Sequence, residues 1–268
     1  MGWLQAIVLS AVQGITEFIP VSSSGHLVLM QHFLGVEIVE DNIFFEILVH
    51  FGTSLAILLV YYRDLAELAR SCLSGERQRR LVAWRYVGCL AVGSLPVALA
   101  GLFFYDQLAA IFARPSLAAL MLLITGAILY SSKFRPGTQL EVSIKFALLI
   151  GLAQAMALLP GISRSGITIV AALMIGVSRT EAGRFSFLLA LPALFGASFL
   201  DFRKIDSLET LPMSLSMTLA ALAVSAVVGY FSLKILLDFV HRGQLHYFSY
   251  YCVAAALVSL VLILGFNV

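Results

Sequence analysis

The sequence predicts an all-α, polytopic integral membrane protein with six spanning helices and two re-entrant helical hairpins, arranged as two inverted repeats. Three observations predict this fold. The 268 residues are 60% hydrophobic and only 12% charged, whereas soluble domains carry about 25% charged residues. Six apolar stretches are long enough to cross a bilayer. Two further apolar regions are interrupted by Pro, Gly and Ser, and their residues match at a fixed spacing.

The first interrupted region, residues 2–35, is broken near its middle by the sequence EFIPVSSSGH at residues 17–26. Proline costs about 3 kcal/mol inside a helix, and each half is too short to cross a hydrocarbon core of about 30 Å. We therefore expect two helices that enter and leave the membrane on the same side. Irregular backbone at that depth is tolerated where it is buried in protein or lines a wet cavity.

The spans follow from apolar stretches of roughly 17–25 residues. They are predicted at residues 44–62, 82–104, 116–131, 184–200, 214–237 and 247–266. A second interrupted region, residues 143–176, lies between the third and fourth spans and contains PGISRSGIT at residues 160–168. It is expected to form the second re-entrant hairpin.

The two interrupted regions match without a gap, because 154 − 13 and 185 − 44 both give 141. The matching pairs are Gln13 with Gln154, Ser22 with Ser163, Ser24 with Ser165, Gly25 with Gly166, Gly35 with Gly176, and Phe44 with Phe185. We expect one membrane domain, residues 1–268, with repeat 1 at about 1–131 and repeat 2 at about 142–268. Each repeat would have one hairpin and three spans. An odd number of spans inverts the second repeat relative to the first.

The basic residues predict the orientation in the membrane. The N-terminus, residues 36–43, 105–115 and 201–213, and the C-terminus would share one side, which holds three basic residues: Arg114, Arg203 and Lys204. The other side holds thirteen: Arg63, Arg70, Arg77, Arg79, Arg80, Arg85, Lys133, Arg135, Lys145, Arg179, Arg184, Lys234 and Arg242. The positive-inside rule makes this second side cytoplasmic. The first hairpin then enters from outside and the second from the cytoplasm.

Glu17 is the first candidate functional residue, because an ionisable group at membrane depth is costly and indicates function by default. Gln13 lies four residues earlier, on the same helical face. Together they offer oxygen ligands that suit a divalent cation. Alternatively, Glu17 is a buried acid that a neighbouring hydroxyl or Arg164 satisfies.

The residues after Pro20 suggest a phosphate site. Serine side chains can cap the second helix of the hairpin, and the free N–H groups at a helix start favour phosphate. Ser23 and His26 are three residues apart and can share a face, which is a nucleophile–base arrangement. The alternative is that the serines only cap a broken helix and that His26 is a packed polar residue. Candidate substrate-binding residues here are Gln13, Ser22, Ser24 and Gly25.

The second hairpin offers a complementary set. Arg164 presents a fork of N–H groups fitted to phosphate oxygens, and glycine lets the backbone approach a ligand. The candidate substrate-binding residues are Gly161, Ser163, Ser165, Gly166 and Thr168. Glu17 could itself be the partner of Arg164, with substrate displacing the pair. Glu46 and His50, four residues apart, could line the same site or make ordinary buried polar contacts.

These groups together suit hydrolysis of a phosphoric anhydride, which needs charge stabilisation, positioning and a nucleophile or base. The membrane setting predicts that the rest of the substrate is lipid. A transporter or flippase for an anionic lipid is the alternative, since re-entrant hairpins in inverted repeats also build transporters. The pairing of Ser23 with His26 beside Glu17 favours the enzyme. Nucleic acid is excluded as a partner, because the net charge is only +2 and no basic cluster is interleaved with aromatic residues.

At QGITEFIPVSSSGH and PGISRSGIT, with support from GVSR and FSFLLALP, the chain resembles the undecaprenyl-diphosphate phosphatase family of the bacitracin-resistance type. The resemblance implies a multi-pass enzyme of the bacterial inner membrane, with its site open to the periplasm, that converts undecaprenyl diphosphate to the carrier lipid undecaprenyl phosphate. It also implies a divalent cation, Mg²⁺ or Ca²⁺.

By motif position, the resemblance makes Glu17 the acidic residue and metal ligand, Ser23 the nucleophile, His26 the essential histidine and Arg164 the phosphate-binding arginine. Gln13 departs from the glutamate that many members have at that position, which leaves Glu17 as the one acidic ligand. The sequence does not decide between attack by Ser23 and attack by water that His26 activates. Nor does it decide between a monomer and a homodimer.

Overall fold

The computed structural model describes every residue except 1, 34–40, 113, 135–139, 203–212 and 267–268. Regular structure in the described residues is helical, apart from one isolated parallel β-bridge between Leu140 and Val177. Four residues used in the sequence analysis, Gly35, Arg135, Arg203 and Lys204, lie outside the described residues.

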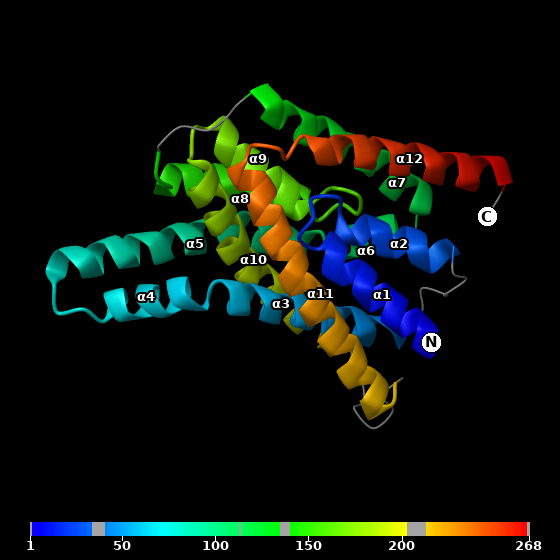
Figure 1. The fold of residues 1–268 in the computed structure, drawn as a ribbon, viewed down its shortest axis with the longest axis horizontal. Helices are drawn as coiled ribbons and strands as arrows, with labels where there is room; N and C mark the ends of the chain where they lie inside the picture. Colours follow the sequence, from blue (N-terminus) through cyan, green and yellow to red (C-terminus); the bar gives the residue numbers. More distant parts are fainter. Residues whose placement is uncertain (1, 34–40, 113, 135–139, 203–212, 267–268) are drawn as a thin grey trace.

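Both interrupted regions fold as pairs of short helices. The first hairpin consists of α1 (Trp3–Thr16) and α2 (Ser23–Phe33), and the second of α8 (Ile144–Met156) and α9 (Arg164–Met174). None of the four reaches the length that a membrane span needs. The tips of the two hairpins meet near the middle of the molecule (Figure 1), where the Gly161 N–H donates to Ser22 Oγ at 3.1 Å.

The long helices agree with the predicted spans. They are α5 (Arg77–Phe103), α7 (Pro115–Ser131), α10 (Arg179–Phe202), α11 (Leu215–His241) and α12 (Tyr247–Phe266). Five described helices are long and apolar enough to cross a membrane. The first predicted span is α3 (Asp41–Val60), which is followed by a bend of 70° into α4 (Tyr62–Cys72). If that bent pair forms one span, the count is six.

The prediction of an all-helical polytopic membrane protein is therefore confirmed. The number of spans and the division into repeats stay predictions.

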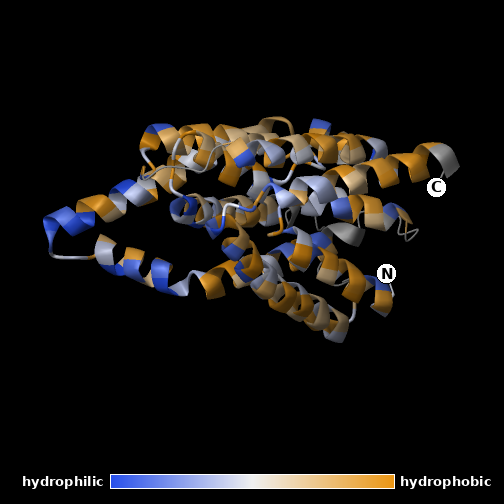
Figure 2. Cartoon of the chain, turned by 45° about the horizontal axis from the view of Figure 1, so that its top comes forward, coloured by the Kyte–Doolittle hydropathy of each residue, from blue (hydrophilic) through white to orange (hydrophobic). Residues whose placement is uncertain are grey.

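Two helices were not predicted. α4 carries Arg63, Asp64, Glu67 and Arg70, so it is too polar for a search based on apolar runs. It packs against the start of α5, and the two form an arm that projects beyond the bundle (Figure 1) and is largely hydrophilic at its end (Figure 2). The short helix α6 (Tyr105–Phe112) connects α5 to α7, and a single turn, η1 (Ser132–Phe134), follows α7.

Each hairpin packs along one long helix of the other half of the chain: α1 along α11, and α8 along α5. Glycines allow the close approach that helix pairs in membranes use. A Cβ built on Gly151 of α8 would lie 2.2 Å from the Gly93 carbonyl oxygen of α5, and one on Gly14 of α1 would lie 2.9 Å from Val228 Cβ of α11. At the offset of 141 residues, α1 corresponds to α8 and α5 to α11. The packing of α1 on α11 is thus equivalent to the packing of α8 on α5, with the roles of the two halves of the chain exchanged.

A buried aromatic cluster supports the first hairpin tip. Phe18, the second residue after α1, is fully buried and makes an edge-to-face contact with Phe187 of α10 at a centroid distance of 5.8 Å. Such contacts are favourable beyond their burial. Because Phe18 is fixed in the core, the preceding residue, Glu17, is held at a defined position.

Candidate active site at the hairpin tips

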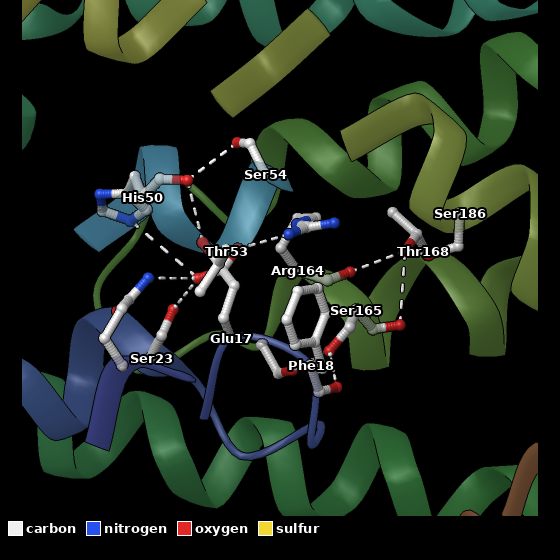
Figure 3. Close-up of polar contacts among 12 residues, drawn as sticks. Glu17, Phe18, Ser23, His50, Thr53, Ser54, Arg164, Ser165, Thr168 and Ser186 are labelled. Carbon is white, nitrogen blue, oxygen red and sulfur yellow. Dashed lines mark hydrogen bonds and ion pairs between the residues drawn. The ribbon is translucent and has the colours of Figure 1, made fainter. Parts of the chain in front are cut away.

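Glu17 lies at the centre of the site (Figure 3). It caps the C-terminus of α1 and is only 5% exposed. Its Oε1 is paired with Arg164 Nη2, while its Oε2 accepts hydrogen bonds from Ser23 Oγ at 2.7 Å and from Gln13 Nε2 at 3.0 Å. A buried carboxylate must be paired and hydrogen-bonded to be tolerated, and every one of these partners comes from the two hairpins.

Arg164 is the first residue of α9, and its side chain is 15% exposed. Its Nη2 binds Glu17, the partner given above as an alternative to substrate, but its Nη1 is buried and has no hydrogen-bond partner among the described residues. A buried donor without an acceptor costs about 1–3 kcal/mol. This orphan N–H group, beside a carboxylate and a hydroxyl, therefore indicates a site for an anionic oxygen.

Buried hydroxyl groups hold the backbone of Arg164 in place. Thr168 Oγ1 donates to the Arg164 carbonyl at 2.7 Å and also contacts Ser186 Oγ of α10. Thr168 and Ser186 are fully buried, so this chain of hydroxyls links the start of α9 to α10 (Figure 3). In the structure, the predicted residue Thr168 thus holds the backbone of Arg164 through a hydrogen bond. The sequence analysis missed Ser186, which lies inside the apolar run of a predicted span.

His50 of α3 also faces Glu17, with Nε2 4.0 Å from Glu17 Oε2. Its Nδ1 donates to the Glu46 carbonyl at 2.8 Å, because a carbonyl oxygen can only accept. The spacing of four residues between Glu46 and His50 indicated that they could line the site, and His50 does lie beside Glu17. Glu46 contributes to this contact through its backbone carbonyl, which accepts the hydrogen bond from His50 Nδ1.

The predicted pair of Ser23 and His26 is not formed. The Ser23 hydroxyl donates to Glu17, and both ring nitrogens of His26 have other partners: Nδ1 binds the Ser22 carbonyl and Nε2 binds the Tyr251 hydroxyl, each at 2.9 Å. Ser23 is the first residue of α2, and helical side chains tilt toward the N-terminus of their helix. Its hydroxyl therefore reaches back to the tip, and the shared helical face does not bring it to His26.

The remaining predicted residues hold the two tips together. Ser22 Oγ accepts from the Gly25 N–H at 3.2 Å, and at the equivalent positions Ser163 Oγ accepts from the Gly166 N–H at 3.1 Å. Each serine thus accepts the N–H three residues along, as a helix cap does, although the backbone differs: Ser22 has φ +70° and Ser163 has φ −73°. The paired hydroxyls of Ser22 with Ser24 and of Ser163 with Ser165 are each 3.3 Å apart.

Two further contacts lock the second tip in place. Ser165 Oγ donates to the Phe18 carbonyl at 2.9 Å. Thr125 of α7, for which the sequence gave no signal, donates to the Gly161 carbonyl at 2.7 Å and accepts from the Ser163 N–H at 3.0 Å. Direct contact of these serines with substrate stays a prediction.

Glycine is required where the tips touch. Gly161 has φ +98°, and a Cβ there would lie 2.2 Å from the Ala118 carbonyl oxygen. A Cβ on Gly25 would lie 2.9 Å from Gly161 Cα. The glycines thus let the two hairpins approach until Glu17 and Arg164 meet.

A family model described as bacitracin resistance protein BacA matches residues 6–258. The chain belongs to the BacA family. Its resemblance to that family is thereby confirmed.

Curated relatives of this BacA chain match it over nearly its whole length. A protein of Salinibacter ruber is 39% identical, over 94% of this chain and 96% of its own. One of Korarchaeum cryptofilum is 39% identical, over 97% and 98%, and one of Methanosphaera stadtmanae is 35% identical, over 97% of each. All three are named undecaprenyl-diphosphatase.

The residues that could hold a divalent cation in this BacA chain are Glu17 and Gln13. Gln13 Oε1 is buried and accepts no hydrogen bond from any described residue, so an amide oxygen stands free beside the carboxylate. No group of three or more His, Cys, Asp or Glu that could hold a metal is present among the described residues. Two protein oxygens suit Mg²⁺, which commonly takes one or two protein ligands and completes its shell with water and substrate phosphate.

Proposed function

We propose that this chain hydrolyses undecaprenyl diphosphate to undecaprenyl phosphate and inorganic phosphate. Three features support this function: the curated relatives named undecaprenyl-diphosphatase, the membrane-spanning helices, and a buried site with both an anion-binding group and a hydroxyl. A multi-pass membrane enzyme is suited to a substrate whose polyprenyl chain stays in the bilayer.

The observation that carries this proposal is the buried Arg164 Nη1, which has no partner in the part of the chain that the structure describes. Arg164 Nη2 is bound to Glu17, and Ser23 is bound to the same carboxylate. An anion that accepts from Nη1 would thus lie near the Ser23 hydroxyl. A terminal phosphate has the charge and the oxygens to fill that position, since guanidinium groups bind phosphate through paired N–H groups.

The chemistry of this chain's residues then follows. Ser23 Oγ attacks the terminal phosphorus, and its proton passes to Glu17 Oε2, the atom to which it already donates. The bond from that phosphorus to the bridging oxygen breaks, and undecaprenyl phosphate leaves. Water then attacks the phosphorus of the phosphoserine, the bond from phosphorus to Ser23 Oγ breaks, Oγ takes back its proton from Glu17, and phosphate is released. His26, one turn along α2, accepts a proton from that water.

Arg164 and the N–H groups at the starts of α2 and α9 stabilise the charge on the phosphoryl oxygens. The predicted divalent cation remains a proposal. When bound at Glu17 and Gln13 Oε1, it would add positive charge next to the diphosphate. Mg²⁺ and Ca²⁺ both prefer oxygen ligands of this kind.

The site is proposed to open to the periplasmic side of the inner membrane. The basis is the bias of Lys and Arg, which places the cytoplasm on the side opposite the termini. The first hairpin, which carries Glu17 and Ser23, would then enter from outside. Undecaprenyl diphosphate released at the outer surface would then reach the site without moving its diphosphate group across the membrane.

The test is phosphate release from a C55 prenyl diphosphate by purified protein in detergent, with and without chelator. We expect release from the wild type, loss of release in Glu17→Ala and Ser23→Ala, and a phosphate ester on Ser23 in quenched wild-type reactions. An active Ser23→Ala variant would show that Ser23 is not the nucleophile and that water attacks the phosphorus directly. Binding of the substrate by folded wild-type protein without release would favour the transporter instead.

A further inference from the structure

His26 is held from two sides by groups that the proposed mechanism does not use. Its Nδ1 lies 2.9 Å from the Ser22 carbonyl oxygen, and its Nε2 lies 2.9 Å from the Tyr251 hydroxyl. The two rings are also stacked, with centroids 5.6 Å apart and an angle of 14° between their planes. The two hydrogen bonds therefore fix the imidazole within its own plane, and the stacking restricts its tilting out of that plane.

These contacts define the tautomer of the neutral ring. A carbonyl oxygen can only accept a hydrogen bond, so Nδ1 carries the hydrogen. Nε2 then has the lone pair and accepts from the Tyr251 hydroxyl. Any proton that His26 accepts must arrive at Nε2, so Tyr251 stands at the one position where His26 can act as a base.

Tyr251 reaches His26 from the other end of the chain, 225 residues away in sequence. It lies on α12, which packs along α7, and α7 in turn packs against α2. The next residue, Cys252, is fully buried and its Sγ lies 3.8 Å from the Pro20 carbonyl oxygen. The start of α12 is thus in contact with both the tip and the second helix of the first hairpin.

We propose that Tyr251 is a positioning residue for the reaction: its hydroxyl, which donates to Nε2, fixes the orientation of the His26 ring and gives up this hydrogen bond when Nε2 accepts a proton. The proposal rests on the proposed function, because it assigns His26 a proton-accepting role there. Tyr251 acts on the reaction through the His26 ring. The Ser22 carbonyl sets the tautomer of His26, whereas the Tyr251 hydroxyl and ring set the orientation of the imidazole.

The first experiment measures kcat and KM for phosphate release in wild type, Tyr251→Phe, His26→Ala and the double variant. Tyr251→Phe keeps the stacked ring and removes one hydrogen bond, so kcat should fall about tenfold, with KM and the thermal midpoint close to wild type. In the His26→Ala background the same substitution should have no further effect on kcat. Tyr250→Phe is the matched control, since Tyr250 is 58% exposed and makes a ring contact with Tyr130.

A wild-type kcat in Tyr251→Phe would overturn the proposal. So would an equal loss of kcat in the His26→Ala background, because Tyr251 would then act through another group.

The second experiment does not depend on activity. Diethyl pyrocarbonate modifies the imidazole nitrogen that has the free lone pair, and mass spectrometry reads the rate at His26. Loss of the Tyr251 hydroxyl should raise that rate about fivefold in Tyr251→Phe and leave it unchanged in Tyr250→Phe. An unchanged rate overturns the positioning role even in an active enzyme. A raised rate in a protein that releases no phosphate would support the contact and reject the proposed function.

Discussion

At the scale of single residues, the site is built around one buried ion pair. Glu17 and Arg164 each lie at the tip of their hairpin, and both are largely excluded from solvent. Removing one member of a buried pair costs about 3–5 kcal/mol, because the other charge is left uncompensated. Replacement of Arg164 by alanine would therefore confuse stability with function, and a substitution that keeps the charge is more informative.

Arg164→Lys keeps the positive charge but removes the planar fork, so Nη1 and Nη2 can no longer bind substrate and Glu17 together. We expect kcat for phosphate release to fall by at least about 100-fold, the scale seen when one charge-stabilising donor is lost. Arg242→Lys is the matched control. That arginine pairs with Asp238 at 2.9 Å on the surface, where such pairs contribute little. Near-normal kcat in Arg164→Lys would show that only the charge matters.

At the scale of helices and hairpins, glycine decides how closely the elements approach. Gly25 and Gly161 bring the tips together, whereas Gly151 and Gly93 bring α8 against α5. The first contact sets the geometry of the site, and the second sets the packing of a hairpin in the bundle. Substitutions at the two contacts should therefore affect different properties.

Gly25→Ala places a methyl group 2.9 Å from Gly161 Cα, so one tip must move away from the other. Displacement of catalytic groups by about 1 Å costs about 100-fold in rate, and we expect a loss of that size in kcat/KM. Gly196→Ala is the control, because nothing lies within 4 Å of a Cβ there. Wild-type kinetics in Gly25→Ala would mean that the tips need not touch during the reaction.

Gly151→Ala should affect stability. Its Cβ would lie 2.2 Å from the Gly93 carbonyl oxygen, a backbone atom that cannot move alone. Overpacking of this kind costs about 1–3 kcal/mol, which should lower the thermal midpoint in detergent. Gly88→Ala, on the same helix as Gly93 but in open space, should leave the midpoint unchanged or raise it, since alanine favours helix. Equal midpoints for the two variants would contradict the close packing of α8 and α5.

At the scale of the whole molecule, the predicted orientation places a charged arm on the cytoplasmic side. The polar arm of α4 and the start of α5 carries six of the basic residues counted for the cytoplasmic side: Arg63, Arg70, Arg77, Arg79, Arg80 and Arg85. In Figure 1 this arm lies at the end of the molecule opposite the N-terminus. A tip at Gly75, between α4 and α5, should therefore face the cytoplasm.

Cysteine labelling tests this orientation in a chain whose Cys72, Cys89 and Cys252 are replaced by alanine. In right-side-out membranes, an impermeant maleimide should label Arg114→Cys but not Gly75→Cys. In inverted vesicles the pattern should reverse. Labelling of Gly75→Cys from outside would reverse the orientation and place the mouth of the site in the cytoplasm.

The sequence determined much of this protein by local rules. Composition and run length predicted a helical membrane protein, and the Pro, Gly and Ser residues that interrupt two apolar regions predicted where each hairpin turns, because these residues act on the backbone at their own positions. The sequence also offered Glu17 as a partner for Arg164, since two opposite charges at membrane depth must find each other. It missed α4, whose charges hide it from a search for apolar runs.

Only the tertiary structure decided which groups meet across helices. A spacing of three residues allowed Ser23 to face His26, but Ser23 begins its helix and reaches Glu17, while His26 reaches Tyr251. Helical periodicity states which residues share a face of one helix. It does not state how that helix is rotated against its neighbours, or which distant side chain fills the space. Those choices come from packing the whole bundle, in which α12 is in place beside a hairpin formed at the opposite end of the chain.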